Sequence, residues 1–394
     1  MNKKMLELGN KRSIIRELFE FSKQKKAELG ADKVYDFTLG NPSIPAHEDV
    51  NKTIVDVINN TDSTIIHGYT SAPGDNEVRK AIADDLNKRF GTSYKLTDLY
   101  MTCGAAASLC ITFRALAENP TDEILAIAPY FTEYKVFVES AGATFKVVPA
   151  DLNTFEINFE ELEKMINKNT IGIIVNSPNN PSGVVYSEKA LKQLAALLEK
   201  KEKEYGHPVY IICDEPYREI VFDGKTAPHI PNIYKNTIVC YSYSKSLSLP
   251  GERIGYILVP EQIKDSKDIY AACLGAGRAY GYVCAPSLFQ KVIAQVADKT
   301  SDMSEYAKNR DLLYNGLTKL GYECVYPQGA FYLFMKSPEA DANQFMEKAK
   351  KYNIVVVPSD GFGVKGYVRL AYCVSSKTIV DSLPAFAELI KEYK

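Results

Sequence analysis

From about residue 76 onward, the chain alternates between segments of helical periodicity and short apolar runs bounded by Pro, Gly or Asn. This alternation is typical of an α/β fold in which helices cover a mostly parallel sheet. Each run is short and almost continuously apolar, as expected of a strand that is buried on both faces. We predict strands at 123–128, 144–148, 170–175, 208–213, 237–242 and 254–259.

The clearest helical pattern covers residues 187–205. Ser187 is suited to cap its start, and lysines gather at its end, where positive charge complements the helix dipole. Leu191, Leu194 and Leu198 recur on one face of this helix. We interpret this leucine stripe as part of the core and not as a cofactor site.

After about residue 285 the pattern changes to long helices with two strand-like runs between them. This change predicts a separate α+β unit, with helices near 285–320, 341–352 and 376–393 and strands at 330–335 and 368–372. The first 48 residues contain one charged amphipathic helix, 13–29, and a Pro-rich extended stretch. These residues are too few to fold alone, so we expect them to pack on the C-terminal unit and on a partner subunit.

The chain length favours two domains, because 394 residues exceed the size at which a single hydrophobic core keeps growing. We predict a large domain of residues 49–283. We predict that residues 1–48 and 284–394 together form a smaller α+β domain.

The composition is that of an ordinary globular protein, with 46% hydrophobic residues, 24% charged residues and a net charge of −2. Without a long basic block, the chain lacks the electrostatic footprint of a protein that binds nucleic acid or an anionic membrane. No run approaches the roughly 18 apolar residues that a membrane span needs, and the first 30 residues lack the apolar core of a signal peptide. The expected partners are small molecules.

The eight cysteines never fall in a C-x-x-C spacing, and the four histidines form no H-E-x-x-H motif. This spacing argues against a zinc site and against a disulfide framework. Several cysteines lie in apolar runs, as small buried hydrophobic residues do. We expect no metal, reduced thiols and a cytoplasmic location.

Chemically versatile residues follow four of the predicted strands, at the carboxyl ends where open α/β sheets bind their ligands. The segments are PYF at 129–131, NSPNNPSG at 176–183, DEPY at 214–217 and YSK at 243–245. Each alone has a simpler interpretation, as a surface lysine, a helix-capping aspartate or a turn. Together they bring an aromatic ring, an amide, a carboxylate and a lysine to one edge of the sheet.

These segments carry a specific resemblance. SPNNPSG at 177–183, DEPY at 214–217 and SYSKSLSLPGER at 242–253 resemble the signature segments of the class I/II aminotransferases, which are fold-type-I pyridoxal-phosphate enzymes typified by aspartate aminotransferase. The matching order continues upstream to Gly40 and Tyr69 and downstream to Arg369 in YVRLA, so it spans nearly the whole chain. The resemblance implies pyridoxal 5′-phosphate as cofactor and a homodimer with shared active sites.

The resemblance also implies a role for each residue around the cofactor ring. Lys245 would carry the cofactor as a Schiff base and move protons on the substrate. Asp214 would keep the ring nitrogen protonated, which makes the cofactor an electron sink. Tyr217 and Asn180 would hydrogen-bond the ring 3′-oxygen, and Phe131 would stack on the ring, where the family often has Trp or Tyr. Its neighbour Tyr130 is the weaker candidate for stacking.

The phosphate-binding residues implied by the family are Gly104, Ala105, Ala106, Ser242, Ser244, Arg253 and, from the neighbouring subunit, Tyr69. The small residues at 104–106 lie between a strand-like run, 99–103, and a helix, so backbone amides and the helix dipole can meet the dianion. Relatives often have a Ser or Thr in this loop. Because this chain has neither at 104–106, we expect the two serines and Arg253 to make more of the contacts with the phosphate. The guanidinium fork of Arg253 suits phosphate oxygens.

For the substrate, Arg369 matches the arginine that binds the α-carboxylate, with Gly40 and Asn180 beside it. An arginine in an otherwise apolar strand is costly to bury without an anion, which supports this role independently of the family. Arg278 lies in the region where dicarboxylate-specific relatives place a second cation, lent by the other subunit. Its neighbours Tyr280 and Tyr282 are equally consistent with an aromatic substrate pocket.

The leading hypothesis is therefore an aminotransferase that exchanges an amino group between an α-amino acid and a 2-oxo acid. Aspartate or glutamate is the first choice of donor because Arg278 offers a second cation, and an aromatic or broad amino acid specificity is the alternative. A C–S β-lyase of the same fold shares the residues at the cofactor. A cofactor-binding regulator is a third reading, although the chain has no helix-turn-helix extension.

Overall fold

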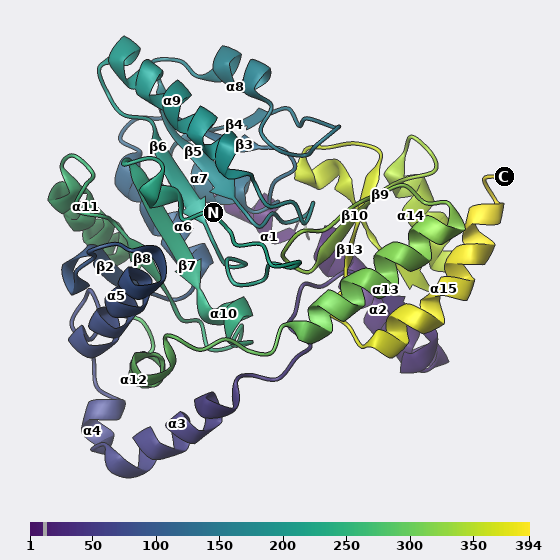
Figure 1. The fold of residues 1–394 in the computed structure, drawn as a ribbon, viewed down its shortest axis with the longest axis horizontal. Helices are drawn as coiled ribbons and strands as arrows, with labels where there is room; N and C mark the ends of the chain where they lie inside the picture. The colour runs from purple at the N-terminus through teal and green to yellow at the C-terminus, as the bar shows by residue number, and fades with distance from the viewer. Residues whose placement is uncertain (11–13) are drawn as a thin grey trace.

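The computed structural model describes residues 1–10 and 14–394. Its largest element is a seven-stranded sheet in the order β2-β8-β7-β6-β5-β3-β4 (Figure 1). Only β8 runs antiparallel to its neighbours, so the predicted mostly parallel sheet is confirmed. The strands are β2 (Leu99–Thr102), β3 (Glu123–Ile127), β4 (Thr144–Val148), β5 (Thr170–Asn176), β6 (Tyr210–Asp214), β7 (Thr237–Ser242) and β8 (Gly255–Leu258).

All six strands predicted for this sheet are present, with small shifts at their ends. One shift matters for the site, because Asp214 is the last residue of β6 and lies in register with Asn176 at the end of β5. Adjacent parallel strands therefore deliver these two side chains to the same edge of the sheet.

Helices cover both faces of the large sheet. Ile173 of β5 packs in the cluster that includes Leu194 of α9, whereas the next residue, Ile174, packs in the cluster that includes Leu109 of α6. This alternation explains why the strands are apolar throughout. The helices around the sheet are α5 (Asn76–Phe90), α6 (Ala105–Leu116), α7 (Tyr134–Ser140), α8 (Phe159–Met165), α9 (Glu188–Tyr205), α10 (Tyr243–Ser246) and α11 (Ser266–Ala279).

The predicted helix 187–205 is confirmed as α9. The Ser187 hydroxyl accepts a hydrogen bond from the Ala190 N–H, as an N-cap does. The three leucines of its stripe are buried in the core.

A second group of elements lies beside the large sheet, on the right in Figure 1. An antiparallel sheet has the order β12-β13-β10-β9, and β1 from the N-terminal region pairs with β11 from the C-terminal region. The elements of this group are β1 (Tyr35–Asp36), β9 (Cys324–Val325), β10 (Tyr332–Lys336), β11 (Ile354–Val355), β12 (Val357–Pro358), β13 (Tyr367–Ala371), α2 (Ile14–Leu29), α13 (Ser304–Leu320), α14 (Ala342–Lys351) and α15 (Ser376–Lys391). Ser13, the predicted start of helix 13–29, lies outside the described residues.

The helical region predicted near 285–320 is two helices, α12 (Ser287–Val296) and α13, which is a correction. A polar run at 298–302 interrupts the apolar periodicity, and within it the Ser301 N–H donates to the Ser246 carbonyl oxygen. Val292 of α12 is buried in the core of the large sheet. Near it lie the helices α3 (Glu48–Asn60) and α4 (Ser63–Ile66), and the chain starts with α1 (Lys3–Asn10).

Across the described residues, none of the helices combines the length and the apolarity that crossing a bilayer requires.

Candidate active site

A cavity of about 290 Å³ lies at the carboxyl ends of the central strands, between the large sheet and the small one. Twelve of the residues predicted for the site line it: Gly40, Ala105, Ala106, Phe131, Asn180, Asp214, Tyr217, Ser242, Ser244, Lys245, Arg253 and Arg369. These residues come from segments that are more than 300 positions apart in the sequence, from Gly40 to Arg369. The fold therefore brings most of the predicted site together.

Lys245 lies in the short helix α10, directly after β7. The Ser242 hydroxyl caps this helix by accepting from the Ser244 N–H, and the Lys245 Nζ donates to the Gly40 carbonyl oxygen at 2.7 Å. Burial lowers the pKa of Lys245 to about 8, and the positive charges of Arg253 and Arg369 add to this effect. A buried amine with this pKa has a much larger neutral, nucleophilic fraction near pH 7 than an ordinary lysine.

Asp214 presents an incompletely paired carboxylate to the same cavity. The residue is 5% exposed, and its Oδ2 accepts a short hydrogen bond from the Tyr134 hydroxyl. Its Oδ1 is buried and has no hydrogen-bond partner among the described residues. Burial raises the pKa of Asp214 to about 7, against the lowering effect of the Tyr134 hydroxyl, and the negative Glu215 raises it further. A buried carboxylate oxygen without a donor is suited to a cationic N–H group.

Two asparagines fix the loop that follows β5. The Asn176 Oδ1 accepts from the Asn180 N–H at 2.8 Å, and the Asn176 Nδ2 donates to the Asp214 carbonyl oxygen at 2.9 Å. The Asn180 Oδ1 in turn accepts from Arg369 at 3.0 Å. One chain of hydrogen bonds thus joins the predicted acid, the predicted amide and the predicted carboxylate-binding arginine.

Arg369 is a buried cation without an anion. It lies in β13, is 2% exposed, and donates only to the Asn180 Oδ1 and, at 2.6 Å, to the Thr38 carbonyl oxygen. Its Nε has no partner, and no carboxylate among the described residues forms an ion pair with it. The guanidinium lies over the Tyr332 ring at 4.5 Å. Since burying an unpaired charge is costly, this geometry favours an anionic ligand.

The cavity lining also includes the first residues of a helix, two hydroxyls and a further cation. Gly104, at φ +88°, caps α6 without a side chain, so the first amides of that helix are open to a ligand. The positive φ of Gly104 favours glycine, and a Cβ there would lie 2.8 Å from an Arg253 nitrogen and displace that guanidinium. The Ser242 and Ser244 hydroxyls bond each other at 2.5 Å. These groups are suited to a phosphate dianion.

The structure distinguishes the two candidates for stacking on a ligand ring, Phe131 and Tyr130. Phe131 lines the cavity and meets the Tyr134 ring edge to face at 5.6 Å. Tyr130 does not line the cavity and packs against Phe145 at 5.3 Å. The geometry therefore favours Phe131 for contact with a ligand ring.

Three predicted residues do not line this cavity: Gly104, which directly precedes the lining residues Ala105 and Ala106, and the more distant Tyr69 and Arg278. Tyr69 is 91% exposed in the loop that follows α4, and Arg278 is exposed in the last turn of α11. Both were predicted to serve the site of a neighbouring subunit. Their positions in a single chain leave that prediction open.

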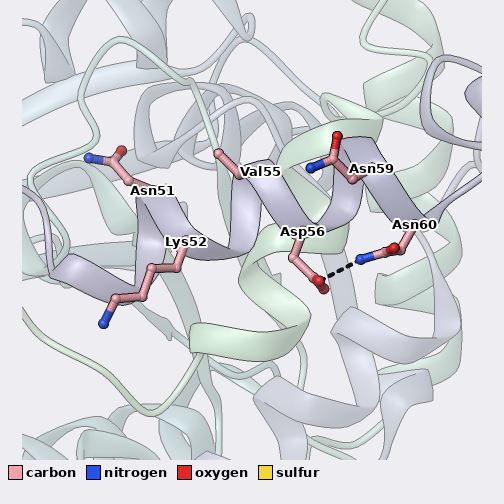
Figure 2. A pocket seen from close by; sticks show the side chains of 6 residues that line it. All are labelled: Asn51, Lys52, Val55, Asp56, Asn59 and Asn60. Carbon is pink, nitrogen blue, oxygen red and sulfur yellow. Dashed lines mark hydrogen bonds between the residues drawn. The ribbon is translucent and has the colours of Figure 1, made fainter.

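A second hollow, of about 560 Å³, lies on the outer side of α3. Figure 2 shows that all six of its lining side chains come from this one helix, and that Asp56 and Asn60 bond each other. No second element contributes a converging group among the described residues, so this hollow has no features of a ligand site.

A family model describes the same chain. The model of the class I and II aminotransferases matches residues 32–383. The chain belongs to this family. It is therefore an aminotransferase, and the predicted family, enzyme class and aspartate-aminotransferase-like fold are confirmed.

Individual relatives agree with this assignment. The crystal structure of an amino transferase from Eubacterium rectale is 56% identical, covers 100% of this chain and 99% of its own, and has a TM-score of 0.99. An aspartate/prephenate aminotransferase of Thermus thermophilus is 29% identical over 82% of this chain and 83% of the relative. The aromatic-amino-acid aminotransferase 2 of Thermococcus litoralis is 26% identical over 99% and 98%. The names of these relatives mention different substrates. The comparison therefore identifies the reaction as amino transfer but does not identify the amino acid.

The family uses pyridoxal 5′-phosphate, and the unpaired groups of this aminotransferase fit it. The Asp214 Oδ1 lacks a donor that a ring N–H would supply. The start of α6 with Arg253 lacks an anion that a phosphate would supply. The Lys245 amine lines the same cavity.

Sequence reasoning missed several residues that hold the site together. Tyr134 donates to Asp214, Asn176 joins two loops, and the Tyr332 hydroxyl lies 3.0 Å from that of Tyr217. Asn176 ends β5 and Tyr134 begins α7, the helix after β3, so their positions near the ligand-binding edge were an available signal. Tyr332 lies within the predicted strand 330–335, where a buried tyrosine has the pattern of an ordinary core residue.

Proposed function

We propose that the chain binds pyridoxal 5′-phosphate at Lys245 and transfers an amino group between an α-amino acid and a 2-oxo acid. The observation that supports this most is the meeting of three incompletely paired groups in one cavity. These groups are the Lys245 amine, the Asp214 Oδ1 and the Arg369 Nε. Native proteins seldom leave buried polar atoms without partners, so such atoms point to a ligand.

When bound, the cofactor supplies an electron sink for the substrate α-carbon. Asp214 would hold the proton on the ring nitrogen, and Tyr217 and Asn180 would hold the ring oxygen. Phe131 would cover one face of the ring and exclude water from it. The phosphate would be held at the start of α6 by 104–106, together with the side chains of Ser242, Ser244 and Arg253.

Lys245 would act twice. Its neutral amine would be the nucleophile that holds the cofactor, and as a free amine it would take a proton from the substrate α-carbon and return it. The lowered pKa of about 8 suits both tasks, because the amine can give up and take back a proton near neutral pH. The Gly40 carbonyl oxygen accepts a hydrogen bond from the Nζ and so holds the amine at the cavity that Arg369 also lines.

Arg369 would bind the α-carboxylate of the substrate through its guanidinium fork. Its present partners are two neutral oxygens, of Asn180 and Thr38, which neutralise no charge. They orient the fork and leave the Nε for the ligand.

For the donor we propose a dicarboxylic amino acid, with an aromatic or broad specificity as the alternative. Arg278 would then supply the second cation from the neighbouring subunit, because in its own chain it lies outside the cavity. A steady-state comparison of aspartate with phenylalanine in an Arg278→Ala variant tests this. Retained selectivity for aspartate would remove Arg278 from the proposal.

We also propose a homodimer. The region of α3 and α4 exposes Val55, Ile58 and Ile65, at 58%, 53% and 57%, next to the exposed Tyr69. An apolar patch of this kind is suited to a protein interface. A dimer would let Tyr69 reach the phosphate of the other site.

The two-domain division also remains a proposal, with residues 1–48 and the C-terminal region forming the smaller part. Because α12 packs on α3 and α5 and contributes to the core of the larger part, we place the second boundary after α12. We propose a cytoplasmic location, which the eight free cysteines support.

The decisive experiment is spectroscopic. Purified protein with cofactor should show a visible band that glutamate converts to the pyridoxamine spectrum and 2-oxoglutarate restores. Borohydride reduction followed by peptide mapping should label position 245. An unlabelled Lys245 would refute the proposal, and pyruvate with free ammonia from cysteine, without amino transfer, would indicate the lyase.

A further inference from the structure

Tyr332 lies at the meeting point of three residues that the proposed function uses. It belongs to β10, is 2% exposed and lines the cavity. Its hydroxyl lies 3.0 Å from the Tyr217 hydroxyl, and its ring lies 4.5 Å from the Arg369 guanidinium. A Cβ at Gly40 would collide with the Tyr332 hydroxyl. The glycine at position 40 is therefore required by Tyr332 itself.

The two hydroxyls share a single hydrogen bond. Burial raises the pKa of Tyr217 well above its usual value and that of Tyr332 to about 12, so both phenols keep their protons at neutral pH. In such a pair one hydroxyl donates and the other accepts, and the acceptor's own proton must point elsewhere. The orientation of the two protons therefore decides which hydroxyl can donate a hydrogen bond to a ligand.

We propose that Tyr332 is a positioning residue that acts through Tyr217. The Tyr332 hydroxyl donates to the Tyr217 oxygen, and the Tyr217 proton is thereby directed to the ring oxygen of the cofactor. The inference rests on the proposed function, which gives Tyr217 this partner. Because linked hydrogen bonds polarise one another, Tyr332 also strengthens the bond that Tyr217 donates.

The proposal predicts the sign of a measurable shift. A donor on the ring oxygen stabilises its negative charge, and does so more when the nitrogen joined to Lys245 carries no proton. The donor therefore lowers the pKa of that nitrogen. Tyr332→Phe removes the hydroxyl but keeps the ring beneath Arg369, so it should raise this pKa by about 0.5.

The experiment is a pH titration of the absorbance of the holoprotein. Wild type is compared with Tyr332→Phe, Tyr217→Phe and the double variant. The matched control is Tyr372→Phe, which removes another buried hydroxyl from the same hydrophobic cluster. The Tyr372 hydroxyl donates to the Ala330 carbonyl oxygen at 3.1 Å and lies outside the cavity.

We expect Tyr332→Phe to raise the pKa of the chromophore and Tyr372→Phe to leave it unchanged, with both proteins folded by circular dichroism. In the Tyr217→Phe background, the loss of the Tyr332 hydroxyl should add nothing. Additive shifts, or a Tyr332→Phe titration that matches wild type, would overturn the inference alone. A wild-type protein without a pH-dependent band would overturn the proposed function and this inference with it.

Discussion

Two buried arginines, in two clusters of this chain, differ in how they are paired. Arg218 donates to the carboxylates of Glu215 at 3.1 Å and Glu219 at 3.0 Å and to the Tyr256 hydroxyl at 3.2 Å. Arg369 has two neutral oxygens and an unpaired Nε. Both side chains are almost fully buried, so burial does not distinguish them. The difference is that Arg218 has carboxylate partners, whereas Arg369 has none among the described residues.

The buried carboxylates differ in the same way. Glu219 has Arg218, Arg89 and the Tyr241 hydroxyl as partners, and although burial acts to raise its pKa, the two arginines outweigh it and the pKa is lowered. Asp214 has one hydroxyl, and burial raises its pKa to about 7. A completely paired cluster stabilises the fold, whereas an incompletely paired one leaves room for a ligand's charges.

The strongest test of this contrast is Lys245→Met, which removes the cavity's amine and keeps its bulk. We expect amino transfer to fall by at least about 10⁴-fold, since both the nucleophile and the proton carrier are lost. The free energy of unfolding should rise by about 1–3 kcal/mol, because burial lowers the Lys245 pKa to about 8 and the charged form is therefore disfavoured. Chemical denaturation of the cofactor-free protein measures this, and a loss of stability would contradict it.

The next largest effect is expected in the cluster of Arg218 and Glu219, whose charges are paired. Glu219→Gln leaves Arg218 and Arg89 short of a counter-charge, so the free energy of unfolding should fall by about 3–5 kcal/mol. The absorbance and turnover of the folded holoprotein should stay near wild type, because Glu219 does not line the cavity. Glu160→Gln, which breaks an exposed ion pair with Lys164, is the matched control and should change stability little. A loss of turnover without a loss of stability would contradict the comparison.

The sequence predicted those residues of the site whose signal is local, that is, visible in a short segment of the chain. Asp214 ends a buried strand, and Lys245 and Asn180 lie in the segments that follow two others, so their shared location followed from the strand predictions. Their chemical roles stay predictions, although the cavity brings the residues together. Arg369 stood out because a charge within an apolar strand is costly.

The remaining features depend on contacts that no local pattern encodes. Tyr332 bonds Tyr217 from 115 residues away, and Tyr134 bonds Asp214 from 80 residues away. The direction of β8 was also not predictable, since a strand buried on both faces is apolar whichever way it runs. In each case tertiary packing, and not the local sequence, selects the partner.

Asp214→Asn tests the acid of the incompletely paired cluster. The amide keeps the shape and an oxygen for Tyr134 but cannot hold a positive ring nitrogen, so turnover should fall by about two to three orders of magnitude. Stability of the cofactor-free protein should not fall, since a carboxylate that is costly to ionise is removed. Stopped-flow kinetics and a denaturant titration of the same sample measure both. A stability loss like that of Glu219→Gln would place Asp214 with the structural acids.

The smallest expected effect is in the pH dependence of stability. The Asp214 pKa is raised to about 7, so between the unfolded value near 3.8 and pH 7 the folded protein binds more protons than the unfolded chain. Its contribution therefore makes the cofactor-free protein less stable as pH rises through this window, by about 2 kcal/mol between pH 4.5 and 6.5. Glu219, with a lowered pKa, contributes stability that is lost as pH falls.

The two slopes have opposite signs, which separates the two acids in one experiment. Urea unfolding of the cofactor-free protein is measured from about pH 3 to 6.5 for wild type, Asp214→Asn and Glu219→Gln, because the Glu219 contribution is lost below its unfolded pKa of 4.5. Relative to wild type, Asp214→Asn should make stability rise more steeply with pH, and Glu219→Gln should make it rise less. Cofactor should abolish the Asp214 contribution, because a cationic partner stabilises the ionised carboxylate. Identical slopes for the two variants would mean that the unpaired oxygen of Asp214 has no energetic consequence.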